Sequence, residues 1–440
     1  MALIENRYWK LDSILTTEIH LSTPIGHYTG KALEDKLRIN DMDGFLLSVG
    51  HSCVMFPVFV RPCSFSGGKQ ELKQRQDQYF VVTLPGLEEV CCRELRQLGI
   101  EPLKVMAGGV EFRGGLRELY LANLWLRTAT RILVRVGELH ARDFPGFYRK
   151  LLRLPWGRFL RPGGRLEVRA RCHSSRMMHS GRVAETVTAA IERTLGVPSS
   201  TEGDHALVMV RLDGDNCVVS VDSSGPLLHR RGYRQDAVAA PLRETLAAGI
   251  LQLLDWNGSE ALVDAMTGSG TFAIEAALLA ANRPPGRHRQ FAFMAWPRYR
   301  NGLWQLLLQE ADRQRLESIP IRICGVDISP QAIAAAKKNA AQAGVSELVD
   351  FSVQPMQKLQ APAANGLILC NPPYGERIGQ KETLGDLYRE LGDLYQHVFH
   401  GWRAALLSPR DSLTRATGLA WQQQLQFSNG GLKVSLLQRK

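Results

Sequence analysis

The residues best suited to take part in a reaction are Asn371, Pro372, Pro373 and Tyr374, which follow the apolar run GLILC at 366–370. An amine on a base ring is a poor nucleophile because its lone pair is delocalised. An asparagine oxygen and a nearby backbone carbonyl can accept both N–H bonds of such an amine and direct its lone pair toward a methyl group. The prolines stiffen the loop, and a tyrosine ring can stack on an extruded base. The motif therefore predicts methyl transfer to a base amine, with a chance turn as the alternative.

A glycine-rich turn follows another apolar run, ALVDA, earlier in the chain. Asp264 lies in that run, and Thr267, Gly268 and Gly270 lead into the helix predicted over 272–280. Glycines allow a sharp turn and bring backbone amides close to a ligand, but dinucleotide-binding enzymes share this feature. The acid distinguishes an S-adenosylmethionine site from a dinucleotide site, because Asp264 precedes the glycines at the carboxyl end of the strand and can face the ammonium group of methionine. The pattern therefore predicts an S-adenosylmethionine site that includes these four residues.

A second acid, Asp327, lies in the sequence GVDIS with Ile328 beside it. A carboxylate at the end of a strand can accept hydrogen bonds from both hydroxyls of a ribose. In a simple dinucleotide fold this acid follows the glycines by about 20 residues. Asp327 lies 57 positions beyond Gly270, because residues 281–304 are inserted between them, and Ser329 then caps the next predicted helix. Asp327 and Ile328 are therefore predicted to contact the cofactor, and a simple loop acid is the alternative.

Positive charge is concentrated in one part of the chain. The formal net charge is +11 at pH 7, and residues 142–182 contain eleven Lys or Arg against two acidic residues. Such a concentration suits a nucleic-acid backbone, where each neutralised phosphate releases counterions. Arg169, Arg171 and Arg176 are therefore predicted to contact phosphates rather than to read bases. A basic face that serves only solubility is the alternative.

The composition is typical of a globular protein, with 45% hydrophobic and 22% charged residues. No apolar run reaches the 18 or so residues of a membrane span, and the N-terminus lacks the basic-then-apolar layout of a signal peptide. We therefore expect a cytoplasmic protein without a membrane partner. The eight cysteines form no CxxC pair, so they are expected to be reduced thiols, and no metal site is predicted.

The order of strand-like and helix-like segments indicates two kinds of domain. Short strands alternate with helices between residues 78 and 225, which predicts small α+β units. A helix is predicted to begin at Pro241. After it, short apolar runs joined by helices, with a final hairpin around Asn429, predict a parallel sheet covered on both sides, the layout of a class I methyltransferase. Residues 1–77 show no sustained periodicity and are predicted to be a poorly ordered appendage.

Five motifs occur in an informative order: LHRRGYR at 228–234, APLRETLAA at 240–248, DAMTGSGT, GVDIS and NPPYGERI. Together they resemble the THUMP-domain-containing class I RNA methyltransferases, most of all the bacterial enzymes that methylate guanine N2 in 23S large-subunit ribosomal RNA. The resemblance covers roughly residues 78–440, and NPPYGER is its most specific part. It implies an α+β ferredoxin-like and THUMP region that grips structured RNA, above all ribosomal RNA. A Rossmann-like domain that uses S-adenosyl-L-methionine would follow.

The resemblance and the motifs together assign residues to roles. The residues predicted to bind the cofactor are Asp264, Thr267, Gly268, Gly270, Asp327, Ile328 and Asn371. The residues predicted to hold the guanine amine are Asn371, Pro372, Pro373 and Tyr374. The residues predicted to contact RNA are Arg169, Arg171, Arg176, Arg230, Arg231 and Arg234. The predicted division of the chain is an appendage at 1–77, a ferredoxin-like segment at 78–145, a THUMP domain at 146–225, a linker and first helix at 226–250, and a methyltransferase domain at 251–440.

One position departs from the family pattern and keeps alternatives open. Similar proteins have an Asp after the third strand, able to contact the adenine amino group, where this chain has Pro355. Cofactor affinity is therefore expected to be weakened, or Gln354 takes over part of this role. The alternatives are adenine-N6 methylation of DNA, guanine-N2 methylation of transfer RNA, and a non-catalytic RNA-binding assembly factor. The modified nucleotide and the oligomeric state stay open.

Overall fold

The computed structural model describes residues 76–203, 205–234, 242–374, 381–429 and 431–440, with the backbone alone at 381–383. It also places the backbone of three antiparallel strands, β1 (Leu37–Arg38), β2 (Leu46–Val49) and β3 (Ser52–Met55). These strands belong to a unit that spans Met1–Leu72, and Lys73–Lys440 form a second unit. Apart from these strands and the last two residues, the appendage predicted at 1–77 lies outside the described residues.

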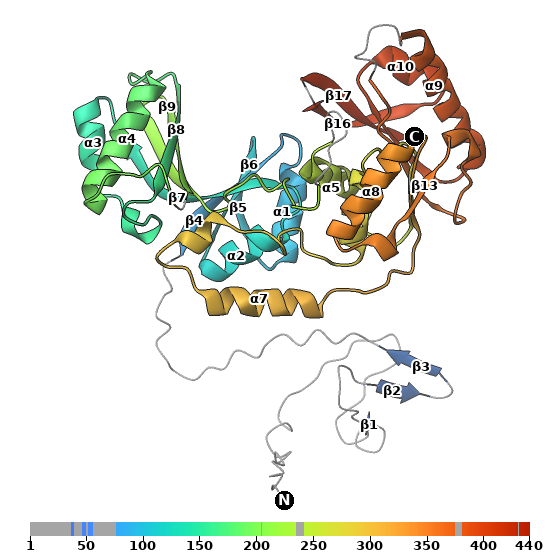
Figure 1. The fold of residues 1–440 in the computed structure, drawn as a ribbon, viewed down its shortest axis with the longest axis horizontal. Coiled ribbons are helices and arrows are strands. Elements are labelled where there is room, and N and C mark those ends of the chain that lie inside the picture. The colour runs from blue at the N-terminus through green and yellow to red at the C-terminus, as the bar shows by residue number, and fades with distance from the viewer. Residues whose placement is uncertain are drawn as a thin grey trace, which may run out of the picture. The chain divides into compact units, whose positions relative to one another are not determined.

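A seven-stranded sheet in the order β5-β6-β4-β7-β10-β9-β8 forms the first half of the second unit (Figure 1). Neighbouring strands are antiparallel except β8 and β9, which are parallel. The strands are β4 (Asp77–Thr83), β5 (Pro102–Met106), β6 (Gly109–Gly114), β7 (Ala129–His140), β8 (Arg165–His173), β9 (His205–Asp213) and β10 (Asn216–Asp222). The helices are α1 (Glu88–Gln97), α2 (Leu116–Trp125), α3 (Phe144–Leu151), η3 (Trp156–Arg158) and α4 (Ser180–Leu195).

The helices of this half cover one face of the sheet. Along β4, Tyr79 and Val81 are fully buried, whereas Phe80 between them is half-buried, the alternation expected of a sheet with one covered face. The predicted strand and helix alternation is thus present, and α4 ends at Gly196 in the left-handed region, with φ 79°. The sequence did not predict β5, because this edge strand lacks alternation and its Leu103 is 53% exposed.

A second seven-stranded sheet, in the order β13-β12-β11-β14-β15-β17-β16, forms the other half. The first five strands are parallel, and β17 is antiparallel to both β15 and β16. The strands are β11 (Ala261–Asp264), β12 (Ile323–Asp327), β13 (Asp350–Val353), β14 (Gly366–Cys370), β15 (Arg403–Ser408), β16 (Trp421–Asn429) and β17 (Leu432–Arg439). The helices are α5 (Glu244–Leu253), α6 (Thr271–Ala280), η4 (Ala292–Ala295), α7 (Asn301–Arg313), α8 (Pro330–Gln342), η5 (Ser346–Leu348), η6 (Met356–Lys358), α9 (Lys381–Asp393), η7 (Leu394–Val398) and α10 (Asp411–Ala416).

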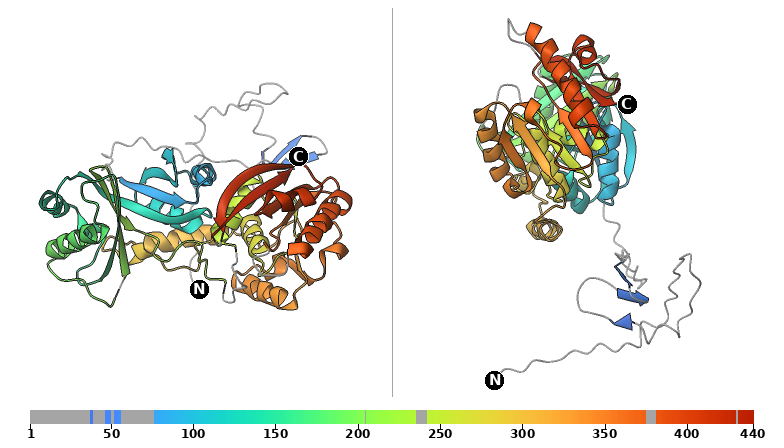
Figure 2. Two further views of the ribbon diagram at one scale, coloured as in Figure 1. Left: turned by 90° about the horizontal axis from the view of Figure 1, so that it is seen from above. Right: turned by 90° about the vertical axis from the view of Figure 1, so that its right-hand side faces the viewer.

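Helices cover both faces of this second sheet (Figure 2). In β14, Leu367 packs in a core with α5 and α6, whereas the next residue, Ile368, packs in another core with α9. All five residues of β14 are buried, which explains why the strand reads as a continuous apolar run. The predicted parallel sheet with a closing antiparallel hairpin is confirmed. Strands β11, β12 and β14 therefore end together at one edge, where the predicted site residues follow them.

The insertion at 281–304 packs into the first half rather than onto the second sheet. The Phe293 ring stacks on Tyr120 of α2 with 4.4 Å between centroids, and Trp304 meets Tyr120 edge to face. The Phe293 amide donates a hydrogen bond to the Ser223 carbonyl at 3.0 Å. The two halves therefore share an aromatic core through this segment, which was identified from the sequence only as an insertion between the glycine turn and Asp327.

The linker helix begins later than predicted. Pro241 was predicted as the first helical residue but lies outside the described residues, and α5 begins at Glu244 with Arg243 as its extended N-cap. The Leu242 carbonyl accepts a hydrogen bond from Arg234 at 3.0 Å. The extended backbone of Arg243, with ψ 140°, sets the start of the helix after Leu242.

Candidate cofactor and methyl-transfer site

The glycine-rich turn connects β11 to the buried helix α6. Gly268 and Gly270 have φ angles of 52° and 84°, values that residues with a Cβ rarely adopt. A Cβ on Gly270 would lie 3.0 Å from both the Ala336 Cβ and the Phe351 ring. The turn is closed by the Gly270 amide, which donates to the Thr267 carbonyl at 2.9 Å. The glycines thus allow a tight turn that ends at a helix N-terminus, a place that favours anionic ligand groups.

Asp264 is the buried acid that the sequence placed at the end of β11. It is 1% exposed. Its Oδ2 accepts a hydrogen bond from the Thr267 hydroxyl at 2.7 Å, while its Oδ1 has no partner among the described residues. Burial raises the pKa of Asp264 to about 7; the Thr267 hydrogen bond opposes this shift and the negative charge of Asp327 adds to it. A buried carboxyl group with an unpartnered oxygen fits a cationic ligand group such as an ammonium.

Asp327 lies at the end of the neighbouring strand and faces the same turn. Its Oδ2 accepts a hydrogen bond from the Gly268 amide, and its Oδ1 accepts one from the Ser329 amide, both at 2.9 Å. Each carboxylate oxygen can accept a further bond, so hydroxyl groups of a ligand can still be held. Ile328 and Val353 beside it are 74% and 51% exposed. Exposed apolar side chains next to a polar turn suit a flat ring such as adenine.

Pro355 occupies a turn after β13, as the sequence indicated. Its neighbour Gln354 has a side-chain amide that donates to the Ser352 hydroxyl at 3.1 Å. The Gln354 backbone amide donates to the Asp327 carbonyl at 3.1 Å. This segment is therefore tied to the strand that carries Asp327, and it has Pro355 where the family resemblance implies an acid.

The predicted amine-binding motif follows β14, which pairs with β11 so that Leu369 lies opposite Asp264. Asn371 is half-buried, and its Oδ1 accepts a hydrogen bond from the Tyr374 hydroxyl at 2.5 Å. Tyr374 packs against the core of the domain, and burial raises its pKa to about 12. Asn371 is thus fixed at the strand edge where the predicted cofactor-binding residues lie. The sequence did not predict this bond between Tyr374 and Asn371.

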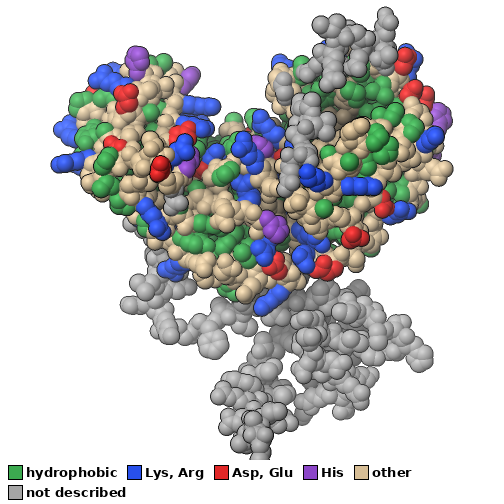
Figure 3. Space-filling model, in the orientation of Figure 1, with side chains coloured by type: hydrophobic (Ala, Val, Ile, Leu, Met, Phe, Trp, Pro, Cys, Tyr) green, Lys and Arg blue, Asp and Glu red, His purple; other side chains and the backbone are tan. Residues whose placement is uncertain are grey.

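The arginines predicted to contact RNA fall into two groups. Arg169, Arg171, Arg176 and Arg230 are exposed. Arg169 already bonds a carboxylate, since its Nε lies 2.5 Å from Glu167 Oε1. Figure 3 shows Lys and Arg side chains on the part of the molecule that carries α3, α4 and β8, and also elsewhere on the same face.

The prediction is corrected for Arg231 and Arg234. Arg231 is 5% exposed and lies 3.5 Å from Glu275, and Arg234 bonds Thr271 at 2.7 Å. Both guanidinium groups point into the protein, so they are not available to phosphates. A charge within the apolar run FAIEAALLA, at Glu275, is the sequence signal that could have indicated a buried ion pair.

Comparison with known proteins places this arrangement in a family. Family models match the chain as an RlmL ferredoxin-like domain over residues 78–133, a THUMP domain over 141–222 and an RMKL-like methyltransferase domain over 231–438. The putative RNA methyltransferase slr0064 of Synechocystis is 34% identical over 368 residues, which cover 82% of this chain and 95% of that protein. The chain belongs to the THUMP-domain-containing class I RNA methyltransferases.

Other relatives of this THUMP-containing methyltransferase differ in length. The ribosomal RNA large subunit methyltransferase K/L of Methylococcus capsulatus is 38% identical over 372 residues, which cover 81% of this chain but 50% of that protein. The chain thus spans about half the length of the K/L relatives. A putative methyltransferase, SMU.472, whose crystal structure contains SAH, is 31% identical with a TM-score of 0.76, covering 83% of this chain and 98% of that one. A Listeria monocytogenes protein described as a predicted N6-adenine-specific DNA methylase is 30% identical with a TM-score of 0.76, covering 82% of this chain and 96% of that one.

The THUMP-containing methyltransferase uses S-adenosylmethionine. The residues present fit this cofactor, because the unpartnered oxygen of Asp264 suits its ammonium group and Asp327 suits its ribose. Exposed apolar side chains at Ile328 and Val353 leave a surface for its adenine.

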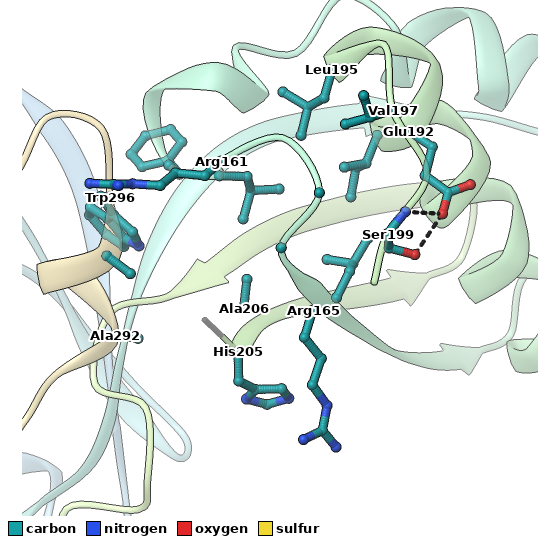
Figure 4. A pocket seen from close by; sticks show the side chains of 17 residues that line it. Arg161, Arg165, Glu192, Leu195, Val197, Ser199, His205, Ala206, Ala292 and Trp296 are labelled. Carbon is teal, nitrogen blue, oxygen red and sulfur yellow. Dashed lines mark hydrogen bonds between the residues drawn. The ribbon is translucent and has the colours of Figure 1, made fainter. Parts of the chain in front are cut away.

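A pocket in the THUMP part of the molecule is separate from these residues (Figure 4). It lies between α4 and the insertion, with Trp296 on one side and Leu195 on the other. Glu192 at its rim accepts hydrogen bonds from the Ser199 amide and hydroxyl. Its volume of about 40 Å³ is enough to hold a few water molecules.

The described part of the chain has neither a candidate metal site nor a candidate membrane helix. No group of three or more His, Cys, Asp or Glu side chains is arranged to hold a metal ion there. The six cysteines in this part of the chain are free thiols. No helix in it is both long enough and apolar enough to cross a membrane.

We predict that the affinity for S-adenosylhomocysteine rises with pH between about 6 and 8. Asp264 has a pKa of about 7, so it is mostly protonated below that pH. The ammonium group of the ligand prefers the ionised carboxylate, so binding below pH 7 must release a proton and should weaken by up to about tenfold per pH unit. Isothermal titration calorimetry at several pH values measures this. The Asp264→Asn variant should bind S-adenosylhomocysteine weakly, with an affinity that does not change with pH. A wild-type affinity that does not change with pH would show that Asp264 does not hold the ammonium group.

Proposed function

We propose that this protein transfers a methyl group from S-adenosylmethionine to the exocyclic N2 amine of a guanine in 23S ribosomal RNA. The observation that carries the proposal is the position of Asn371, directly after β14 and beside the strand that ends in Asp264. Relatives described as ribosomal RNA large subunit methyltransferases K/L, at 36% and 38% identity, support ribosomal RNA as the substrate. We further propose that the protein acts in the cytoplasm.

The proposed mechanism rests on orientation of the amine. S-adenosylmethionine, when bound, supplies a methyl group on a positively charged sulfur. The amide oxygen of Asn371 has two lone pairs, so it can accept an N–H bond of guanine while it keeps the bond from the Tyr374 hydroxyl. That hydroxyl would fix the orientation of the Asn371 side chain, and the two prolines between them would stiffen the loop. A backbone carbonyl of the motif would accept the second N–H bond, and the Tyr374 ring would stack on the base.

The first half of the unit is proposed to grip the RNA. We assign residues 78–145 to a ferredoxin-like domain and 146–225 to a THUMP domain, followed by a linker with the first helix at 226–250 and the methyltransferase domain at 251–440. Exposed arginines on this half, among the Lys and Arg side chains that Figure 3 shows there, support contact with a phosphate backbone.

We predict that neutralising Arg169, Arg171 and Arg176 together weakens RNA binding at physiological salt. The slope of log affinity against log salt should become less steep by roughly 0.7 to 0.9 for each phosphate contact that is lost. Fluorescence anisotropy with a labelled 23S fragment at several salt concentrations measures both effects. Unchanged affinity and slope would place the RNA elsewhere.

A matched control removes the same charge from the methyltransferase domain. The control variant replaces Arg322, Arg389 and Arg415, all exposed, by Gln. It should keep most of the salt dependence. An equal loss in both variants would mean that net charge rather than a defined surface binds the RNA.

The proposed substrate is tested by offering the purified protein 23S ribosomal RNA, transfer RNA and duplex DNA with radiolabelled S-adenosylmethionine. Label is expected in 23S RNA, and digestion followed by mass spectrometry should identify N2-methylguanosine. N6-methyladenine in DNA would favour the activity named for the Listeria relative. Label in transfer RNA alone would replace the ribosomal target, and no label on any substrate that binds would favour an assembly factor.

A further inference from the structure

Arg234 lies in the linker between the two halves, and its side chain reaches the start of α6. Its Nη2 donates to Thr271 Oγ1 at 2.7 Å and to the Leu242 carbonyl at 3.0 Å. Its Nε lies 3.6 Å from Glu244 Oε1 of α5. Thr271 is the first residue of α6, directly after Gly270, and is 6% exposed. Arg234 therefore ties the glycine turn to the linker.

A second contact holds the same face of α6 one helical turn further on. Glu275 is fully buried, lies 3.5 Å from Arg231 Nε and accepts a hydrogen bond from the Tyr233 hydroxyl at 3.1 Å. Thr271 and Glu275 are four residues apart, so they lie on one face of the helix. The linker thus contacts α6 at two points, through Arg231 at Glu275 and through Arg234 at Thr271.

The first half of the unit holds the other end of this helix. Arg231 Nη2 donates to the Arg127 carbonyl at 2.5 Å. The Arg127 guanidinium in turn donates to the carbonyls of Leu278 and Arg283, at 3.1 and 2.8 Å, near the C-terminus of α6. Leu278 belongs to the last turn of α6, and Arg283 lies just beyond its end, where its own amide also donates to the Leu278 carbonyl at 2.8 Å. The helix that carries the cofactor turn is therefore fixed by groups from the linker and from the RNA-binding half.

We propose that Arg234 is a positioning residue for the cofactor. It does not need to touch S-adenosylmethionine. By holding the Thr271 hydroxyl it fixes the first turn of α6, and with it the glycine turn at Gly268 through Gly270 whose Gly268 amide holds Asp327. A bond from a charged donor to a buried hydroxyl is strong, and leaving either group unpaired in this setting is costly. This inference concerns cofactor binding and does not depend on the proposed RNA substrate.

A double-mutant cycle on the full chain tests the proposal, with S-adenosylhomocysteine as the probe in calorimetry. Arg234→Gln and Thr271→Ala should each weaken binding roughly tenfold, the scale of one charge-assisted hydrogen bond. The double variant should bind no worse than the weaker single variant, because both changes remove the same bond. Thr271→Ser keeps the hydroxyl and should bind within about twofold of wild type.

The control is Arg243→Gln, an exposed arginine next to Glu244. It should leave the affinity unchanged. In a methylation assay, Arg234→Gln should raise the KM for S-adenosylmethionine and change kcat far less, which a general loss of structure would not do. The proposal is overturned if Arg234→Gln binds like Arg243→Gln, or if the losses of the two single variants multiply in the double variant. If Arg234→Gln does not fold, Thr271→Ala and Thr271→Ser decide: equal affinities in these two would overturn it.

Discussion

Replacing Asn371 by Ala is expected to lower methyl transfer at least about 10²-fold, roughly 2.7 kcal/mol or more in the barrier. The change removes the side-chain oxygen that would align the target amine. Asp264 and Asp327 remain in place, and their bonds to Thr267 and to the Gly268 amide do not involve Asn371. The affinity for S-adenosylmethionine should therefore change little. Single-turnover methylation with saturating RNA, together with calorimetry on the same preparation, measures the two quantities.

The comparison variant for this experiment is Asn371→Asp. It keeps an oxygen of the same reach, so it should retain more activity than Asn371→Ala, although its charge alters the bond to Tyr374. Near-native turnover by a folded Asn371→Ala variant would contradict the amine-alignment mechanism. The NPPY sequence would then be a structural turn.

Replacing Tyr374 by Ala is expected to cost about 1–3 kcal/mol in kcat/KM for RNA, roughly 5-fold to 150-fold, by loss of base stacking. The structure adds a second effect, because the Tyr374 hydroxyl also holds the Asn371 oxygen at 2.5 Å. The expected loss is therefore at the upper end of this range. Steady-state methylation of a 23S fragment measures it.

Tyr374→Phe separates the two effects. It keeps the ring and removes the bond to Asn371. If stacking dominates, Tyr374→Phe should be nearly as active as wild type; if orientation of Asn371 dominates, it should be nearly as impaired as Tyr374→Ala. Full activity in both variants would remove Tyr374 from the proposed mechanism.

The local features of the cofactor site could be predicted from the sequence because they depend on short stretches of chain. Gly268 and Gly270 adopt positive φ angles that few other residues tolerate, so their spacing after Asp264 already indicates the turn. Strand β14 is buried on both faces and reads as one apolar run. Parallel strands that end at one edge bring Asp264, Asp327 and Asn371 to the same side of the sheet.

Which side chain meets which across distant segments was decided only by the tertiary structure. The sequence does not show whether an arginine faces solvent or a buried carboxylate. Arg231 and Arg234 were therefore predicted to contact RNA, although they contact α6 instead. The burial of Glu275 depends on a linker more than 40 positions away. Likewise, no local pattern indicates that Phe293 stacks on Tyr120. The sequence determined the glycine turn that we propose binds the cofactor. Long-range packing decided what holds that turn in place, because such contacts depend on shape and burial rather than on spacing along the chain.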